Sequence, residues 1–152
     1  MKPRNFVLAS LLCLLATSIA FSQNPNLGTW KLDEAKSKIP AGVGKNTTVI
    51  FSAAGADIKV STDGTNAQGQ QVHTEWTGQF DGKPYPSIGD PNATYRAYKA
   101  KGEHTLLLAN MKGDKTVSNG RITISKDGKS RTVEMTYFGS KKVKAKYVYE
   151  KQ

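Results

Sequence analysis

Few side chains in this sequence have the types and spacing that catalysis requires. The two histidines, His73 and His104, are far apart in the chain. A histidine acts as a general base only when a nucleophile lies within hydrogen-bond reach, and no Gly-x-Ser-x-Gly nucleophile elbow occurs. An enzyme would need His73 and Glu75 to converge with Tyr or Asp side chains inside the fold. We therefore expect a non-catalytic protein with both histidines at its surface.

Metal and nucleotide sites also lack their usual signatures. Cys13 is the only cysteine and no His-x-x-x-His pair occurs, so no residues have zinc-ligand spacing. Asp63-Gly64 and Asp127-Gly128 lack the further acidic residues of a calcium loop and are typical of hairpin turns. No Gly-rich phosphate loop precedes a helix. The sequence therefore predicts no metal and no cofactor.

Lysines and aromatic residues interleave between positions 141 and 149, a composition typical of nucleic-acid surfaces. In a strand, however, Lys142, Lys144 and Lys146 fall on one face. The opposite face then carries the residues that alternate with them: Val143, Ala145, Tyr147 and Tyr149. Base stacking needs rings on the same exposed face as the charges. The separation favours a half-buried strand over a nucleic-acid site, and it leaves an anionic headgroup or glycan as an alternative partner for the lysines.

The first 20 residues are typical of a secretory signal peptide. Lys2 and Arg4 precede an unbroken run of apolar and small residues from 6 to 20, with cleavage expected at 20–22. The alternative, a membrane anchor, needs roughly 20 apolar residues. Cys13 lacks the small preceding residue of a lipoprotein site. We expect a secreted or periplasmic protein of one domain, residues 23–152, that is neither lipidated nor membrane-spanning after cleavage.

The charge is strongly basic. The chain has 22 Lys and Arg against 12 Asp and Glu, a formal charge of +10. Such a balance favours anionic partners. The alternative is that it serves solubility, because the basic residues are spread along the whole chain.

Short segments with an alternating pattern fill the mature chain. We expect nine strands, at 27–32, 46–52, 57–61, 70–80, 94–99, 104–111, 116–125, 130–138 and 142–150. Residues 33–38 would make one helical turn. Residues 83–91 carry three prolines and are expected to form a rigid loop across a barrel mouth. Short connections and the removal of sheet edges favour a single up-and-down antiparallel β-barrel of about eight or nine strands.

Gly28 and Trp30 are expected to form the base of this barrel. Glycine lets the first strand bend and another part of the chain come close, and the indole fills one end.

Four ordered motifs carry a resemblance to a known family. They are Gly28-Thr29-Trp30-Lys31-Leu32, Ala35-Lys36-Ser37-Lys38, Asp81-Gly82-Lys83-x-Tyr85-Pro86-x-x-Gly89-x-Pro91 and Ser125-Lys126-Asp127-Gly128-Lys129. Together they resemble secreted bacterial lipocalin-like proteins of the calycin superfamily. The resemblance implies a calycin-type barrel, binding of a small ligand, and a cation packed over Trp30, supplied by Lys144, Lys146 or Arg131.

The chain departs from the related fatty-acid-binding proteins at two places. About 13 residues separate the first two expected strands, too few for the two helices those proteins carry there. Their last-strand Arg-x-Tyr pair aligns with Tyr147 and Tyr149, so only the tyrosine is present.

Alternation places a set of apolar and aromatic residues toward the barrel interior. The ligand-pocket candidates are Trp76, Phe80, Tyr85, Leu106, Leu108, Met135, Tyr137, Tyr147 and Tyr149, with Tyr85 as a gate. Further interior positions are Ile58, Val60, Val72, Ile122, Ile124 and Val133. We expect a monomer that binds a small hydrophobic or amphipathic ligand. The alternative is a solid-core envelope protein whose basic face contacts anionic polymer or headgroups; a cavity of roughly 300 Å³ or more would favour the first.

Overall fold

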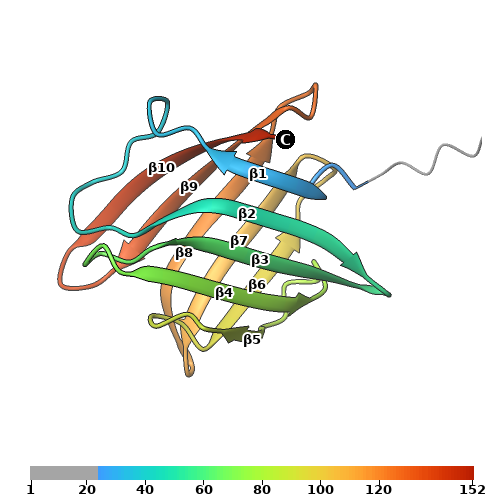
Figure 1. Cartoon of the computed structure of the whole chain (residues 1–152). Coiled ribbons are helices and arrows are strands. Elements are labelled where there is room, and N and C mark those ends of the chain that lie inside the picture. The colour runs from blue at the N-terminus through green and yellow to red at the C-terminus, as the bar shows by residue number, and fades with distance from the viewer. Residues whose placement is uncertain (1–23) are drawn as a thin grey trace, which may run out of the picture.

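The structure, a computed structural model, describes residues 24–152, so the expected signal peptide and Cys13 lie outside the described residues. Ten antiparallel strands form one closed barrel, in which each strand pairs with its neighbours in sequence and β1 pairs with β10 (Figure 1). The strands are β1 (Gly28–Leu32), β2 (Lys45–Ala54), β3 (Asp57–Thr65), β4 (Gln71–Gly78), β5 (Tyr85–Ile88), β6 (Tyr95–Ala100), β7 (Thr105–Lys112), β8 (Lys115–Ile124), β9 (Ser130–Phe138) and β10 (Lys142–Lys151). The predicted up-and-down barrel is confirmed, with ten strands instead of nine.

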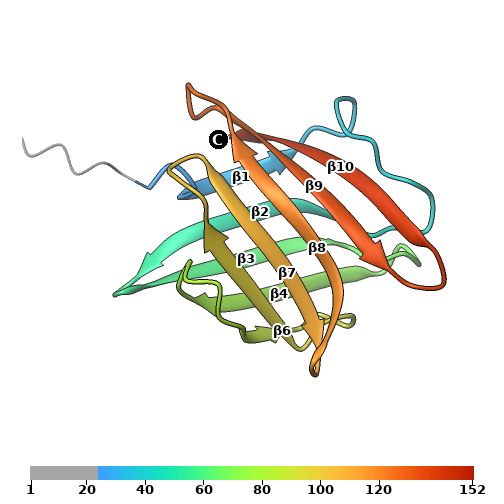
Figure 2. The ribbon, with the colours of Figure 1, turned by 180° about the vertical axis from the view of Figure 1, so that it is seen from behind.

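The barrel places two groups of strands on opposite sides of one interior. Strands β2 to β4 lie in front in Figure 1, and β6 to β9 lie in front in the reverse view of Figure 2. Along β10 the lysines at 142, 144 and 146 are exposed, whereas Ala145, Tyr147 and Tyr149 are buried. This is the alternation predicted for the segment, and it explains why the lysines stay in water while the rings fill the interior.

The prediction of a rigid loop at 83–91 is wrong in part, because residues 85–88 form strand β5. Tyr85 and Pro86 pair with β6, and Ser87 and Ile88 pair with β4. Proline has no N–H to donate, so this ladder has only two residue pairs on each side. Barrel closure makes this proline-containing segment a strand although its sequence disfavours one. β5 is the shortest strand of the barrel.

Two turn predictions are also corrected. Residues 33–38 form a turn instead of a helix, in which the Lys36 amide donates to the Asp33 carboxylate at 3.1 Å. Asp63-Gly64 lies inside β3 and the turn falls at 66–69. A Cβ on Gly64 would lie 2.7 Å from the Asn46 Cα, where the β2–β3 register shifts. Gly64 therefore marks a bulge with close backbone approach.

Trp30, the predicted base residue, lies in the core of the barrel. It is fully buried, and its indole N–H donates to the Asn26 carbonyl at 2.9 Å. The Arg131 guanidinium lies 4.8 Å from the ring centre and the Lys151 ammonium 5.2 Å from it. The cation over Trp30 is thus Arg131, together with the unpredicted Lys151. Lys144 and Lys146 point outward and are exposed, because they sit on the other face of β10.

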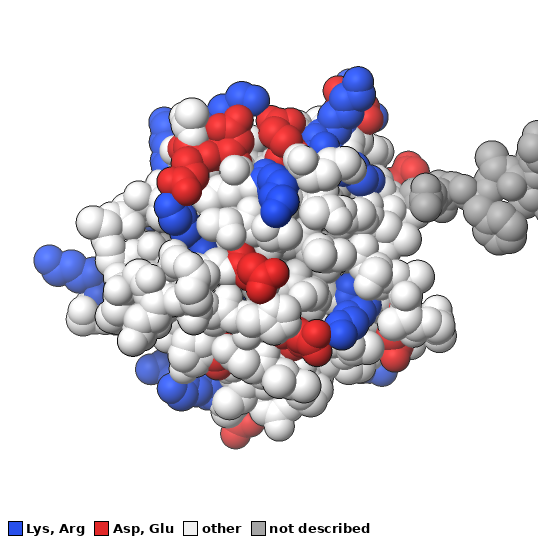
Figure 3. Space-filling model, in the orientation of Figure 1, with Lys and Arg blue, Asp and Glu red and all other residues white. Residues whose placement is uncertain are grey.

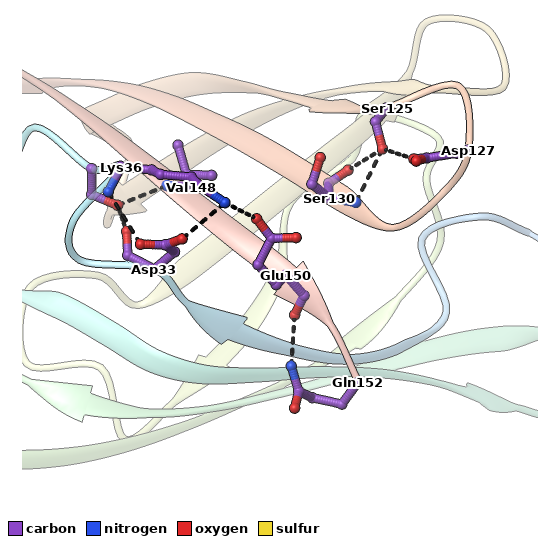
Figure 4. A network of polar contacts seen from close by, with 9 residues as sticks. Asp33, Lys36, Ser125, Asp127, Ser130, Val148, Glu150 and Gln152 are labelled. Atoms are coloured by element: carbon purple, nitrogen blue, oxygen red, sulfur yellow. Dashed lines mark hydrogen bonds and ion pairs between the residues drawn. The ribbon is translucent and has the colours of Figure 1, made fainter.

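Outer contacts fix the ends of the strands. Lys36 forms ion pairs with Asp33 at 3.1 Å and with Glu150 of β10 at 2.9 Å (Figure 4). In the β8–β9 turn the Ser125 hydroxyl donates to Asp127 at 2.6 Å. Acidic and basic side chains are interspersed on the face drawn in Figure 3 instead of gathering in one patch. Among residues 24–152, no helix is long and apolar enough to cross a membrane.

Candidate functional site: the barrel cavity

The barrel encloses a cavity of about 600 Å³. It reaches the connections that follow β1, β3, β5 and β9 and the last residue of β7, which all lie at one end of an up-and-down barrel. At its other end it stops at Phe51, Tyr98, Arg131 and Tyr149, close to Trp30. The cavity therefore has a loop-rimmed mouth and an aromatic floor, and its volume is within the range of small-molecule sites.

The structure brings five of the nine pocket candidates together on the cavity wall: Leu108, Met135, Tyr137, Tyr147 and Tyr149. Among the further interior positions, Val72, Ile122 and Val133 also line it.

The other four candidates are not on the cavity wall. Leu106 is buried in the core. Trp76 packs edge-on against Tyr98 with ring centres 4.8 Å apart, and Phe80 packs against the same ring at 5.8 Å. These two rings pack against Tyr98, which itself lines the cavity, so they lie behind the cavity wall.

Tyr85 does not gate the mouth. Its ring stacks edge-on against Trp76 at 5.7 Å, and its hydroxyl donates to Asp81 at 3.0 Å. Both contacts lie at the β4–β5 connection, at the opposite end of the barrel from the mouth. The later part of the proline-rich segment does reach the mouth, where Asp90 and Pro91 line the cavity.

Arg131 is the most unusual group of the cavity floor. It is 2% exposed, and its guanidinium is surrounded by the rings of Trp30, Phe51 and Tyr149 at 4.8–5.0 Å. Its Nε and Nη1 atoms are buried without a hydrogen-bond partner. Burial lowers the pKa of Arg131 to about 10, so the side chain is charged at neutral pH. The floor therefore holds an uncompensated cation with free donors.

A second arginine lies higher on the wall within a polar network. Arg96 donates to Asp90 at 3.1 Å and to Asn110 at 2.7 Å, and Asn110 donates to Ser118 at 2.9 Å. The side chains of Arg96 and Asp90 are 8% and 14% exposed. Unlike Arg131, Arg96 has a counter-ion in Asp90 and a second acceptor in Asn110.

The hydroxyls of the cavity tyrosines form hydrogen bonds within the barrel wall. The hydroxyls of Tyr137 and Tyr147 lie 2.8 Å apart, and Tyr147 donates to the Gly44 carbonyl at 2.9 Å. Tyr149 donates to the Asn46 carbonyl at 3.0 Å. Burial raises the pKa of all three phenols. These hydroxyls connect β9 and β10 to the start of β2 and are neutral at physiological pH.

Sequence reasoning missed several wall residues, among them Phe51, Arg96 and Tyr98. The sequence does contain a signal for two of them, because Arg96 and Tyr98 are two residues apart and so share one face of β6. Both side chains are buried in the structure. Arginine is rarely placed inside a barrel by composition alone, because an unpaired charge is costly to bury. Its position facing the cavity becomes clear only once the inward face of β6 is known.

The histidines do not form part of this cavity. His73 is exposed, as predicted, and lies 2.7 Å from Asp63, whose hydrogen bond raises the pKa of the imidazole. His104 is half-buried, which corrects the expectation of a surface residue, and its Nδ1 has no partner. Over residues 24–152, no group of three His, Cys, Asp or Glu side chains is placed to hold a metal ion.

Fold and cavity together define an all-β, closed antiparallel barrel with an internal site, compatible with a lipocalin-like fold. Comparison with protein-family models and with curated proteins gives no match.

Proposed function

We propose that the protein is a non-catalytic, lipocalin-like carrier that binds one small, mainly apolar and amphipathic molecule inside the barrel. The observation that carries the proposal is the cavity of about 600 Å³, which is open at the loop end and lined by both apolar and polar side chains. A solid-core protein would fill this space with side chains, because protein interiors are close-packed.

The chemistry of the wall supports an amphipathic ligand. Val72, Leu108, Val133 and Met135 offer apolar surface, and apolar burial is worth roughly 25 cal/mol per Å² of ligand surface. Many polar side chains line the cavity as well, and they include Arg96, Asp90, Asn110, Ser118 and Arg131. A wall that mixes apolar and polar side chains suits an amphipathic molecule, which buries apolar surface and bonds polar groups at the same site.

Binding of N-phenylnaphthylamine, an uncharged fluorescent probe of apolar sites, tests the proposal. We expect saturable binding to one site per chain. A Met135→Trp variant should fill the cavity and weaken binding by about tenfold or more. Its matched control is Glu134→Trp, one residue away on the exposed outer face of β9, which should bind as the parent does. Absence of saturable binding, or equal weakening by both variants, would contradict the proposal.

The location follows from the expected signal peptide. We propose secretion to the periplasm or medium, with cleavage at 20–22, and a monomeric mature protein. Mass spectrometry of the N-terminus after expression in a bacterial host with a secretion pathway tests this directly. A mature protein that retains residues 1–20 would contradict it.

A second candidate function is contact with an anionic surface through β10. Lys142, Lys144 and Lys146 are exposed in one row, and none of the ion pairs between described residues includes them. Retention on phosphatidylglycerol vesicles should fall with salt, and replacement of the three lysines by glutamine should abolish it. Retention that ignores salt would contradict this candidate.

A further inference from the structure

A row of polar residues crosses four neighbouring strands near the mouth of the cavity. Strand register pairs Arg96 of β6 with Asn110 of β7, Asn110 with Ser118 of β8, and Ser118 with Tyr137 of β9. All four side chains line the cavity, and each residue is close to the mouth end of its strand. We call these four residues the polar row. Its hydrogen bonds determine which donors and acceptors the protein leaves to a ligand.

On one side of the polar row, the hydrogen bonds have a fixed direction. A guanidinium can only donate, so the contact of 2.7 Å between the Arg96 Nε and Asn110 identifies the amide oxygen of Asn110. The amide nitrogen of Asn110 then donates to the Ser118 hydroxyl at 2.9 Å. None of the hydrogen bonds between described residues uses the Ser118 hydroxyl as a donor. This chain therefore ends on a buried O–H group that still has its proton to donate.

The direction is also fixed on the other side, at Tyr137. The Tyr147 phenol donates to the Gly44 carbonyl at 2.9 Å, and a carbonyl can only accept. Tyr147 therefore accepts the proton of Tyr137 across their contact of 2.8 Å. The Tyr137 oxygen keeps its acceptor sites, and its side chain is only half-buried. A free donor on Ser118 and a free acceptor on Tyr137 thus occur on paired residues of β8 and β9.

We propose that Ser118 and Tyr137 bind a neutral head group that both accepts and donates a hydrogen bond, an alcohol or a primary carboxamide. The proposal rests on the proposed function, because it names the head group and the orientation of the ligand in the same cavity. The head group accepts from Ser118 and donates to Tyr137. The apolar tail then extends toward the floor, past Leu108 and Met135, which lie deeper on β7 and β9 and line the cavity.

A charged head group fits this position less well. A carboxylate has no proton to donate to Tyr137, and an ammonium group has no lone pair with which to accept from Ser118. The cation of the polar row already has a counter-ion, because Arg96 lies 3.1 Å from Asp90. A charge on the ligand would therefore be buried without an opposite charge to compensate it, which is costly.

A second pair of hydroxyls on the cavity wall serves as a control. Thr62 of β3 and Thr74 of β4 are both buried, and both line the cavity. Their hydroxyl oxygens lie 2.7 Å apart, so these two side chains bond each other directly. A head group that binds the polar row should not depend on this pair.

The test measures how well ligands with different polar ends displace N-phenylnaphthylamine from the purified protein. Decanol and decanamide accept and donate, whereas methyl nonyl ether, an isomer of decanol, only accepts. Decanoate and decylammonium carry the two charges. We expect decanol and decanamide to bind several-fold more tightly than either charged ligand. Tighter binding of decanoate or decylammonium than of decanol would overturn the neutral head group and leave the carrier function intact. Failure of the probe itself to bind would overturn both.

Variants locate the head group within the cavity. The affinity of decanol is divided by that of its ether isomer in each protein, and comparing this ratio between proteins cancels the difference in hydrophobicity of the two ligands. Tyr137→Phe removes the acceptor that only decanol uses, so the ratio should fall about fivefold. Ser118→Ala removes the donor that both ligands use, so both should bind more weakly.

Thr74→Val is the matched control, because it removes a hydroxyl from the opposite part of the cavity wall. It should keep the parent affinities and the parent ratio. If Ser118→Ala does not fold, the ratio in Tyr137→Phe still decides. A ratio that Tyr137→Phe leaves unchanged, or that Thr74→Val lowers equally, would overturn the assignment to Ser118 and Tyr137.

Discussion

The Arg131 guanidinium lies 4.8 Å from the centre of the Trp30 ring, so a cation from the ninth strand packs on the indole of the first. This contact joins residues 101 positions apart in the chain at the closed end of the barrel. Lys151 reaches the same ring at 5.2 Å. Two cations thus lie against the buried indole next to the cavity floor, and these contacts join β1 to β9 and β10.

Removal of the indole should strongly destabilise the barrel. Trp30 is 0% exposed and donates a buried hydrogen bond to Asn26. We expect Trp30→Ala to lower the free energy of unfolding by about 3–5 kcal/mol, measured by urea denaturation. Ile88, 67% exposed on β5, is the control, and Ile88→Ala should change stability by about 0.5 kcal/mol or less. Similar losses in the two variants would show that Trp30 is not the base of the core.

Gly28 should resist substitution because of its backbone conformation. Its φ is 124°, a value that only glycine adopts at low energetic cost. Gly28→Ala should cost about 1–3 kcal/mol of unfolding free energy, more than Gly55→Ala, where φ is 65° and the space around the Cβ is open.

A double variant separates strain from steric clash at Gly28. A Cβ there would lie 2.7 Å from the flexible end of Lys151. We expect the cost to come from backbone strain. The double variant Gly28→Ala, Lys151→Ala should therefore lose as much unfolding free energy as the two single variants added together. Recovery of stability in the double variant would assign the cost to the clash.

Stability should fall in alkaline solution. Burial raises the folded-state pKa of Tyr137, Tyr147 and Tyr149 above their ordinary value of 10.0. The unfolded chain loses these protons first, so stability present below pH 10 is lost as the pH rises further. Arg131 acts in the opposite direction, because its lowered pKa favours the folded state above about pH 10.

The three tyrosines outnumber the one arginine, so a net loss is expected. The folded state then binds up to about two protons more than the unfolded chain. This difference gives a fall in unfolding free energy of roughly 1–3 kcal/mol per pH unit. Urea unfolding between about pH 8 and pH 11, with tyrosinate absorbance followed in parallel, measures it. Tyr147→Phe should flatten the profile. A stability that is constant or rises over this range would contradict the burial of these phenols.

The Arg96–Asp90 pair should be sensitive to the loss of one partner. Both side chains are largely buried and lie 3.1 Å apart. Asp90→Ala leaves a buried guanidinium without its counter-ion, and we expect a loss of about 3–5 kcal/mol in urea denaturation. Adding Arg96→Met should recover part of it. Lys59→Ala, which breaks an exposed pair with Glu75, is the control and should leave the unfolding midpoint nearly unchanged. Equal effects at the two pairs would contradict the burial of Arg96.

Much of the barrel wall could be predicted from local pattern. The alternation in 130–138 and 142–150 predicts β9 and β10 almost to the residue, since a strand with one face in water and one in the core must alternate. Five of the nine pocket candidates line the cavity for the same reason. Period two identifies the inward face of a strand, but not how far along the barrel axis a residue lies. Trp76, Phe80 and Leu106 face inward and yet pack below the cavity.

The predictions were wrong in segments where closure of the barrel overrides the local conformational preference of the sequence. Pro86 argues against a strand, yet β5 forms because the barrel would otherwise leave the edges of β4 and β6 unpaired. Asp63-Gly64 is a strong turn signal, yet Gly64 is needed inside β3 at a close contact with β2.

The sequence by itself determined that this chain forms an all-β meander with Trp30 near one end, because hydrophobic alternation and turn residues act over a few positions. Only the tertiary structure decided that Arg131, and not Lys144 or Lys146, lies over that indole, and that the interior contains a cavity instead of a filled core. Both depend on strand register and on how the ten strands close, and these are set by contacts between residues far apart in the chain.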